Sequence, residues 1–329
     1  MKAMVIARGK DAGTLELRDV PKPELRPGEL LMRVRATSVN RADLYQLKGA
    51  YPTQAVADGS MIIAGLEAAG EVAGIGENVS GFTIGDRIMA MCTGGYAEFT
   101  ALDHRLAILV PKNLSWEEAA TIPVAYMTEH DALITNARLQ AGESVLVNAA
   151  SSGVGVAGIQ IAKFCGAKPV IGTTGTPAKL AALTNLGMDL GINYRTENFA
   201  DVVLTATNGS GANVIIDHVG GAHLKENLRC MALKGRLISV GRLGQATGEL
   251  DIELLALKRL QLIGVTWRTR TIEEKIAIVR RFTADLLPAL ADGRLRPFID
   301  RIFALHQAPE AQTYMASNGQ IGKIVLKVQ

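Results

Sequence analysis

Three glycines near the middle of the chain have a spacing that could support binding chemistry. In VLVNAASSGVGVAGIQIAKF, Gly153, Gly155 and Gly158 follow the pattern G-x-G-x-x-G, after an apolar run and before a stretch of helical periodicity. Such glycines allow a tight turn, a close approach of the backbone to a pyrophosphate, and contact between helix and sheet. The phosphates would lie at a helix N-terminus. The pattern predicts a dinucleotide site; the alternative is a tight connection and nothing more.

The residues after the next apolar run indicate which dinucleotide is bound. A carboxylate there would accept hydrogen bonds from the ribose 2′-OH of NAD and repel the 2′-phosphate of NADP. The positions instead hold Thr173, Thr174, Gly175 and Thr176, with Lys179 one turn into the next helix and Tyr194 and Arg195 after the third strand. These groups favour NADPH. Thr176–Pro177 also fits a helix cap with proline at the first position, and both roles can hold at one helix end.

The elements around this turn alternate between strand and helix. Candidate strands are 144–149, 168–173, 190–193, 213–217 and 236–240, with helical stretches between them. This alternation predicts an α/β fold with a doubly wound parallel sheet. Residues 1–110 are rich in short apolar runs and turn signals, which is typical of a strand-rich domain. The tail after residue 260 is too short for a domain and is expected to pack on the N-terminal part.

Composition excludes several other classes of protein. The chain has 329 residues, 48% of them hydrophobic and 20% charged, and a formal net charge of +3, so a large core and one or two domains are expected. No run of Lys or Arg suggests a nucleic-acid or membrane surface. The three cysteines form no CxxC pair, and no apolar run is as long as a membrane span. We expect a cytoplasmic protein.

Ten short stretches, in order, resemble the zinc-independent medium-chain reductases of the quinone oxidoreductase (zeta-crystallin) family. They are SVNRADLYQLKGAYP, GLEAAGEVAGIGENVSGFTIGDRI, AATIPVAYMT, SSGVGVAGIQ, GTTGTPAKL, INYRTENF, IIDHVGG, GRLISVG, LIGVTWRTR and IGKIVL. The NRADL stretch and Tyr51 look closest to the subgroup with the damage-inducible quinone oxidoreductase of animals. The resemblance implies a GroES-like catalytic domain of residues 1–118 and 262–329, and a Rossmann nucleotide domain of residues 119–261.

The resemblance also implies roles for individual residues. Ser152, Gly153, Val154 and Gly155 would contact the pyrophosphate; Gly175, Thr176, Lys179 and Tyr194 the 2′-phosphate; Thr128, Gly241 and Leu243 the nicotinamide; and Asn318 would close the site. NADPH would lie between the two domains. A homodimer would form through the apolar strand at 260–267, which would be an aggregation hazard if exposed at a sheet edge.

Two positions argue against a catalytic metal. Zinc-dependent relatives carry Cys where this chain has Asn40, and His where it has Leu66. Catalytic zinc normally has three protein ligands, and the five histidines are scattered, so we expect no metal. A quinone or an enone carries its own electron sink and so needs a Lewis acid less than alcohol oxidation does. Tyr51 and Asn40 are the candidates that orient the acceptor carbonyl, although Tyr51 is equally well explained by packing.

Other positions keep more than one interpretation. For Asp43 and Tyr45 we expect a role in packing or helix capping rather than in the chemistry itself. Glu129 and His130 stand where the family usually has a small and an aromatic residue. We expect His130 on a helix surface; the alternative is a pH-sensitive residue in the pocket. Three functions stay open: an NADPH-dependent quinone reductase, an NADPH-dependent reductase of enones or enoyl thioesters, for which arginines at 268–281 could supply a basic patch, and an NADPH-binding sensor or structural protein with little turnover.

Overall fold

The structure is a computed structural model that describes residues 1–7, 13–51, 54–55 and 61–329. It divides into two compact units, residues 1–127 with 268–329 and residues 128–267. These divisions lie somewhat later along the chain than the expected domain boundaries at 118/119 and 261/262. The units are described below as unit 1 and unit 2, each by itself.

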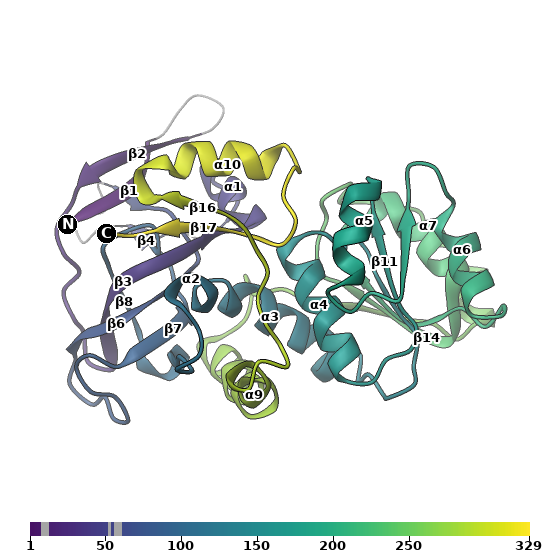
Figure 1. The fold of residues 1–329 in the computed structure, drawn as a ribbon, viewed down its shortest axis with the longest axis horizontal. Coiled ribbons are helices and arrows are strands. Elements are labelled where there is room, and N and C mark those ends of the chain that lie inside the picture. The colour runs from purple at the N-terminus through teal and green to yellow at the C-terminus, as the bar shows by residue number, and fades with distance from the viewer. Residues whose placement is uncertain (8–12, 52–53, 56–60) are drawn as a thin grey trace. The chain divides into compact units, whose positions relative to one another are not determined.

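Unit 1 is built mainly from antiparallel strands (Figure 1). Its elements are β1 (Lys2–Ala7), β2 (Thr14–Asp19), β3 (Glu29–Val39), α1 (Arg41–Leu47), β4 (Gln54–Ala55), β5 (Ile62–Ile63), β6 (Glu67–Ile75), β7 (Arg87–Met91), β8 (Phe99–Asp103), β9 (Ile108–Leu109), α2 (Trp116–Ala119), most of α3 (Ile122–His130), α9 (Ile272–Ala291), β16 (Ile299–Ala304), α10 (Ala308–Ala316) and β17 (Lys323–Lys327). Short 3-10 turns, η1 (His104–Leu106) and η3 (Leu305–Gln307), connect some of them.

The C-terminal tail completes the larger sheet of unit 1. That sheet runs β16-β17-β3-β6-β7-β9, with β8 paired to β3, and a smaller sheet runs β2-β1-β5-β4. Strand β17 pairs antiparallel with β3, and Ile324 lies opposite Val39. The sequence stretch KIVLK has four buried residues and one exposed, so it joins the core rather than an edge exposed to water. The prediction that the tail packs on the N-terminal part is confirmed.

Unit 2 contains the alternating strands and helices. Its elements are the end of α3, a π-helical turn η2 (Asp131–Asn136), β10 (Val145–Val147), α4 (Gly153–Phe164), β11 (Val170–Thr174), α5 (Pro177–Thr184), β12 (Leu190–Asn193), α6 (Phe199–Ala206), β13 (Ala212–Asp217), α7 (Gly221–Cys230), β14 (Met231–Ser239), α8 (Ile252–Leu257) and β15 (Gln261–Gly264). Each strand predicted between residues 144 and 240 is present, with shifts of at most two residues at the ends except for β14, which begins five residues before the predicted strand 236–240.

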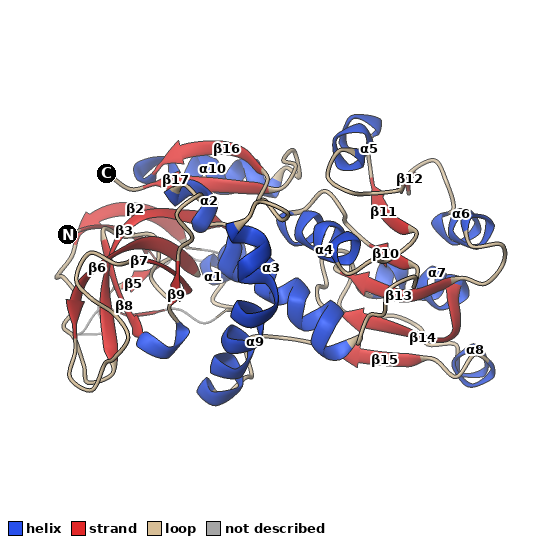
Figure 2. Cartoon of the chain, turned by 60° about the horizontal axis from the view of Figure 1, so that its bottom comes forward, coloured by secondary structure: helices blue, strands red, loops and turns tan. Residues whose placement is uncertain are grey.

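The sheet of unit 2 is parallel throughout and doubly wound. Its order is β12-β11-β10-β13-β14-β15, so successive strands move outward from β10 in one direction and from β13 in the other. Helix α4 lies on one face, and α6 and α7 lie on the other (Figure 2). In such a sheet the connections after β10 and β13 diverge at their carboxyl ends and leave a crevice where ligands bind. The glycine turn follows β10, so it is located at this switch point.

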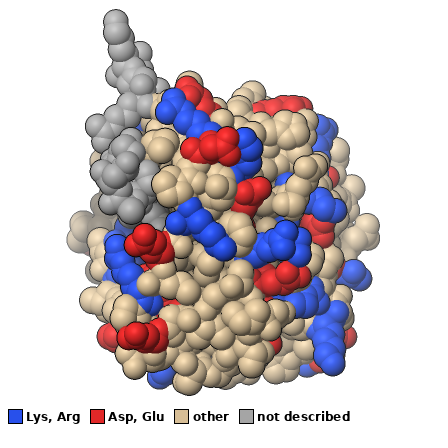
Figure 3. Space-filling view, turned by 90° about the vertical axis from the view of Figure 1, so that its left-hand side faces the viewer, with Lys and Arg blue, Asp and Glu red and all other residues tan. Residues whose placement is uncertain are grey.

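The charged side chains on one face of unit 1 are mixed in sign. On the face of unit 1 drawn in Figure 3, Lys and Arg side chains alternate with Asp and Glu, and neither sign forms a continuous field. Within the described ranges, no helix combines the length and the apolar character that a membrane crossing requires. Among the described residues, the cysteines Cys92, Cys165 and Cys230 form no disulfide bond.

Candidate functional site

The glycine turn in unit 2 has the geometry of a phosphate-binding loop. The Ser152 hydroxyl caps α4 by accepting a hydrogen bond from the Gly155 amide at 3.0 Å. A side chain at Gly155 would place its Cβ 2.5 Å from the carbonyl oxygen of Ala149, so only glycine fits against the turn. The amides of Gly153 and Val154 belong to the first helical turn, which has no carbonyls of its own to accept them. They can therefore receive an anion.

Two threonines at the end of β11 form hydrogen bonds with residues of this turn. The Thr173 hydroxyl donates to Asn148 Oδ1 at 3.0 Å and accepts from the Ala149 amide at 3.3 Å. The Thr174 hydroxyl donates to Ser151 Oγ at 3.2 Å. Both threonines are buried, and their hydroxyls are bonded to the turn. These two hydroxyls, which the sequence places near a 2′-phosphate, therefore support the protein backbone instead. They hold the backbone of the turn in place.

Two of the candidate 2′-phosphate residues, Gly175 and Tyr194, meet at one corner, which also contains Arg195. A side chain at Gly175 would place its Cβ 3.0 Å from both Tyr194 Oη and Arg195 Nε, so glycine is needed for these groups to approach the strand end. Thr176 is the N-cap of α5, but its hydroxyl makes no capping bond. Lys179 lies one turn further into α5. The corner offers hydroxyl and guanidinium groups beside a helix N-terminus, which suits an anion.

The candidate nicotinamide residues are organised around the end of β13. Gly241 follows β14, and a side chain there would place its Cβ 2.5 Å from the carbonyl oxygen of His218. The Leu243 amide donates to the same carbonyl oxygen at 3.1 Å. Thr128, at the end of α3, accepts a hydrogen bond from Trp267 Nε1 at 3.0 Å. These three residues all belong to unit 2, and His218 is the residue that connects two of them.

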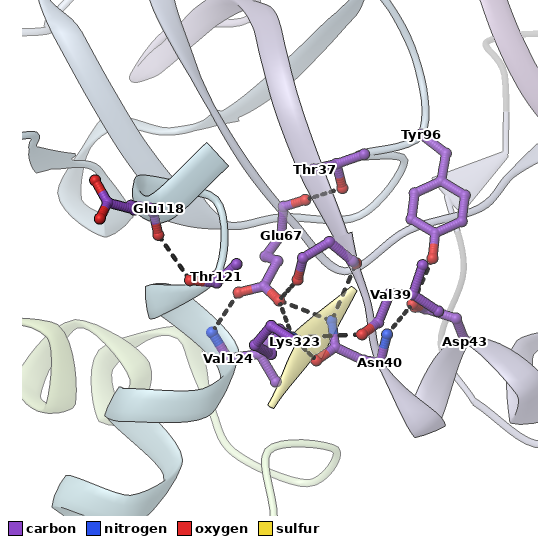
Figure 4. Close-up of polar contacts among 11 residues, drawn as sticks. Thr37, Val39, Asn40, Asp43, Glu67, Tyr96, Glu118, Thr121, Val124 and Lys323 are labelled. Atoms are coloured by element: carbon purple, nitrogen blue, oxygen red, sulfur yellow. Dashed lines mark hydrogen bonds and ion pairs between the residues drawn. The ribbon is translucent and has the colours of Figure 1, made fainter. Parts of the chain in front are cut away.

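Unit 1 contains a buried charged network around Asn40 (Figure 4). The Lys323 ammonium donates to Asn40 Oδ1 at 2.6 Å and to Glu67 Oε1 at 2.9 Å. Asn40 Nδ2 donates to Glu67 Oε1 at 2.8 Å and to the Ser38 carbonyl at 3.3 Å. The Val124 amide donates to the second Glu67 oxygen at 2.7 Å. The network joins β3, β6, β17 and the start of α3.

The donor set of this network does not fit a catalytic zinc ion. Zinc takes thiolate, imidazole or carboxylate ligands, and here an amide, an aliphatic Leu66 and a carboxylate already paired with an ammonium stand together. Among the described residues, no group of three or more His, Cys, Asp and Glu could hold a metal ion. Lys323 was missed by sequence reasoning, because a lysine in a terminal strand gives no signal that it will be buried.

Asp43 is a capping residue whose carboxyl group is buried. Its Oδ2 accepts hydrogen bonds from the backbone amide of Asn40 and from the Tyr96 hydroxyl, both at 2.7 Å. Burial raises the pKa of Asp43 to about 7, against a usual value of 3.8. These bonds favour the structural interpretation of Asp43 over direct chemistry. Tyr45 is 39% exposed.

Tyr51 and Asn318, two further candidates in unit 1, each contact an arginine. The Arg268 guanidinium lies 5.6 Å from the centre of the Tyr51 ring and donates to the Ala50 carbonyl at 3.3 Å. Burial is the main cause that raises the pKa of Tyr51, so its hydroxyl stays protonated near neutral pH. The Asn318 side-chain oxygen accepts a hydrogen bond from Arg41. The catalytic role of Tyr51 remains a proposal.

The expectation that His130 lies on a helix surface is wrong. His130 and its neighbour Glu129 are both 0% exposed. The reason is that α3 continues directly into the π-helical turn η2, and this junction packs against α4 of the glycine turn. A surface helix has one exposed face, whereas every residue of α3 is buried except Val124, which is partly buried.

Replacing Lys323 by Met is predicted to lower the free energy of unfolding by about 3–5 kcal/mol, because it leaves the Glu67 carboxylate buried without its counter-charge. The matched control is Lys327→Met on the same strand, where the lysine is exposed and its pair with Glu117 contributes about 0–1 kcal/mol. Urea unfolding of both variants measures the difference. Equal losses for the two lysines would contradict a dominant role for the buried pair.

Replacing Asp43 by Asn is predicted to change how stability depends on pH. The folded-state pKa is raised, so the unfolded carboxyl loses its proton at lower pH than the folded one, and rising pH favours unfolding. The stability of the native protein relative to Asp43→Asn should therefore fall between pH about 4 and pH about 7, and be constant above that. Unfolding measured across this range gives the answer; a flat difference would refute the assignment.

Comparison with known proteins places this geometry in a family. A sequence model described as "Zinc-binding dehydrogenase" matches residues 153–283, and one described as "Alcohol dehydrogenase GroES-like domain" matches residues 26–112. The human protein named quinone oxidoreductase is 32% identical over 99% of this chain and 97% of its own length. A phenolphthiocerol/phthiocerol polyketide synthase chain of Mycobacterium tuberculosis is 31% identical over 95% of this chain, which spans only 14% of that much longer protein.

Solved structures agree over the whole chain. A mycobacterial protein complexed with NADPH has a TM-score of 0.89 at 26% identity and covers 99% of this chain and 100% of its own. A protein described as an NAD-dependent alcohol dehydrogenase has a TM-score of 0.87 at 30% identity, with 100% of both chains covered. The sheet order, the glycine turn and these matches lead to one conclusion: the chain belongs to the medium-chain dehydrogenase/reductase family and is related to the quinone oxidoreductases.

Proposed function

We propose that this protein is an NADPH-dependent oxidoreductase that transfers a hydride to a quinone without a metal ion. The observation that carries the proposal is the corner formed by Gly175, Tyr194 and Arg195 at the N-terminus of α5, where a carboxylate would stand in an enzyme selective for NAD. The relationship to quinone oxidoreductases over nearly the full chain supports the same class of reaction.

The nucleotide would be held by residues of unit 2. Ser152, Gly153, Val154 and Gly155 would bind the pyrophosphate through the first turn of α4. The 2′-phosphate would be bound by the corner of Gly175, Thr176, Lys179 and Tyr194, and its dianionic charge would be matched by Lys179 and by the helix dipole. Thr128, Gly241 and Leu243 would flank the nicotinamide, and Asn318 of unit 1 would close the site. When bound, the reduced nicotinamide supplies the hydride.

The acceptor would be oriented by residues of unit 1. The Tyr51 hydroxyl stays protonated and can donate a hydrogen bond to an acceptor carbonyl, which stabilises the negative charge that forms on its oxygen. Asn40 is the second candidate, but its amide nitrogen already donates to Glu67 and Ser38. A direct contact from Asn40 would require one of these bonds to be exchanged. The reduced acceptor then takes a proton from water or a nearby donor.

The absence of a metal ion is part of the proposal. The family description names zinc, but here the positions of two zinc ligands hold Asn40 and Leu66, and Lys323 neutralises Glu67. A quinone carries its own electron sink, so hydride addition needs less electrophilic help than alcohol oxidation does.

A second candidate function is the reduction of an activated carbon–carbon double bond. It is supported by the similarity to one region of a polyketide synthase and by Arg268, which lies beside the Tyr51 ring and could contribute to recognition of an anionic substrate. An enone and a quinone both place a carbonyl in conjugation with the carbon that receives the hydride. A third candidate, a sensor that binds NADPH with little turnover, would need the same corner but no acceptor site.

We further propose that the protein forms a homodimer through β15. This strand ends the sheet of unit 2, as expected for the 260–267 segment, and Leu262 on it is 39% exposed. An apolar edge strand with unpaired backbone groups is a template for pairing with another strand. Antiparallel pairing of two copies would cover it.

Replacing Lys179 by Ala is predicted to weaken NADPH binding by roughly tenfold or more and NADH binding much less, because only NADPH carries the 2′-phosphate. The control is Lys225→Ala, an exposed lysine on α7, which should change neither affinity. Fluorescence titration measures both cofactors. Equal losses for NADPH and NADH would reject the assignment of this corner.

The assigned reaction predicts NADPH oxidation in the presence of ortho- or para-quinones that a metal chelator does not diminish. The rate of NADPH oxidation, measured by absorbance with each member of a panel of quinones, enones and enoyl thioesters, shows which of the first two functions is favoured. Turnover of enones alone would favour the second function, and no turnover with any acceptor would favour the sensor. Loss of activity on chelation would overturn the metal-free mechanism.

A further inference from the structure

A buried acid–base pair in unit 2 is not used by the proposed chemistry. Glu129 Oε1 lies 3.3 Å from His218 Nε2, and the two side chains are 0% and 2% exposed. Among the described groups, none donates a hydrogen bond to either Glu129 oxygen, and none bonds His218 Nε2. The two buried groups therefore face each other, and these three side-chain atoms have no other hydrogen-bond partner among the described residues.

Burial restricts the charge state of this pair. An isolated carboxylate in the protein interior is unfavourable by several kcal/mol. Two states avoid that cost: a carboxylate facing an imidazolium, and a carboxylic acid facing a neutral imidazole. In both, the pair has no net charge. The charged groups nearest in the chain are His130, Asp131 and Asp217; Asp217 accepts bonds from the amides of Val219 and Gly220.

The pair lies between two parts of the proposed cofactor site. On one side, a side chain at Gly158 would place its Cβ 2.6 Å from Glu129 Oε2, so the third glycine of the motif makes room for this carboxylate. The motif alone predicts contact between Gly158 and the sheet; in the structure the group opposite it is Glu129. On the other side, the carbonyl of His218 accepts from the Leu243 amide and lies against Gly241.

We propose that Glu129 and His218 are positioning residues that lock the nicotinamide-flanking segment, residues 240–245, to the helix that binds the pyrophosphate. The physical route is continuous: α4 contacts Glu129 at Gly158, Glu129 pairs with His218, and the backbone of His218 holds Gly241 and Leu243. The inference rests on the proposed function, since it assigns the segment to the nicotinamide. It adds a role that the glycine turn and the 2′-phosphate corner do not supply.

The pair should act on affinity through preorganisation. If the segment holds the binding conformation in only about a tenth of the molecules, the apparent affinity for a ligand that needs it falls about tenfold. A ligand that binds only at the two phosphate positions should be unaffected. NADPH is a probe of the first kind, and 2′,5′-ADP, which lacks the nicotinamide, is a probe of the second kind.

The experiment measures Kd for NADPH and for 2′,5′-ADP with the full chain. Glu129→Leu and His218→Leu are each expected to weaken NADPH about tenfold and to leave 2′,5′-ADP unchanged. Glu129→Gln, which keeps a hydrogen-bonding group at the same place, is expected to retain most of the NADPH affinity. The control is Asp201→Ala, which removes an exposed ion pair with Arg229 in the same unit. Thermal unfolding of every variant checks that each one folds.

Each outcome decides the inference. Selective loss of NADPH affinity, with rescue by Glu129→Gln, supports a positioning role. Parallel loss of both ligands means that the pair only stabilises the fold, and no loss means that the segment does not depend on it; either result overturns the inference. If the leucine variants do not fold, Glu129→Ala, which removes the partner of His218 without adding bulk, decides: selective weakening of NADPH supports the role, and unchanged NADPH binding overturns it. A native protein that binds neither ligand refutes the proposed function, and the inference with it.

Discussion

The contact between the Lys323 ammonium and the Glu67 carboxylate is the interaction on which unit 1 depends most. Both side chains are nearly inaccessible to water, at 5% and 0% exposure, so neither charge is tolerable alone. Lys323 comes from the last strand and Glu67 from the sixth, and the pair fixes Asn40 between them (Figure 4). The C-terminal tail is thereby required for the geometry of the candidate acceptor site and not only for the core.

Unit 2 contains two kinds of polar group: those arranged for a charged ligand, and a buried pair that provides its own partner. The glycine turn and the corner at Gly175 present backbone amides, the Tyr194 hydroxyl and the Arg195 guanidinium, groups that suit the anionic ligand we propose. The Glu129–His218 pair is the opposite arrangement, an acid and a base that face each other inside the protein. One set of groups is arranged for a ligand, while the other holds the protein in shape around it.

Much of this could be predicted from sequence, for physical reasons that apply residue by residue. The strands of unit 2 are short apolar runs between helical stretches, and that periodicity is a local property. The structure gives Gly155 a reason of its own, because only glycine tolerates a carbonyl 2.5 Å from the position of a Cβ; its close approach to a pyrophosphate stays a prediction. The absence of an acid after β11 is also visible without any structure.

What sequence could not supply are contacts between residues far apart in the chain. Lys323 and Glu67 are separated by 256 positions, and nothing local marks a lysine as buried. The sequence places His130 at a surface because a π-helical turn and its packing on α4 leave no periodic signal. It groups Thr173 with its neighbours near a phosphate, but the Thr173 hydroxyl is bonded to Asn148 under the turn.

The central claim is tested most directly by titrating the native protein with both nicotinamide cofactors under identical conditions. Because the corner beside α5 offers cationic and hydroxyl groups and no carboxylate, we predict that NADPH binds at least about tenfold more tightly than NADH. High salt should narrow that difference by screening the phosphate. Equal or tighter binding of NADH would contradict the assignment of this corner, and with it the proposed cofactor.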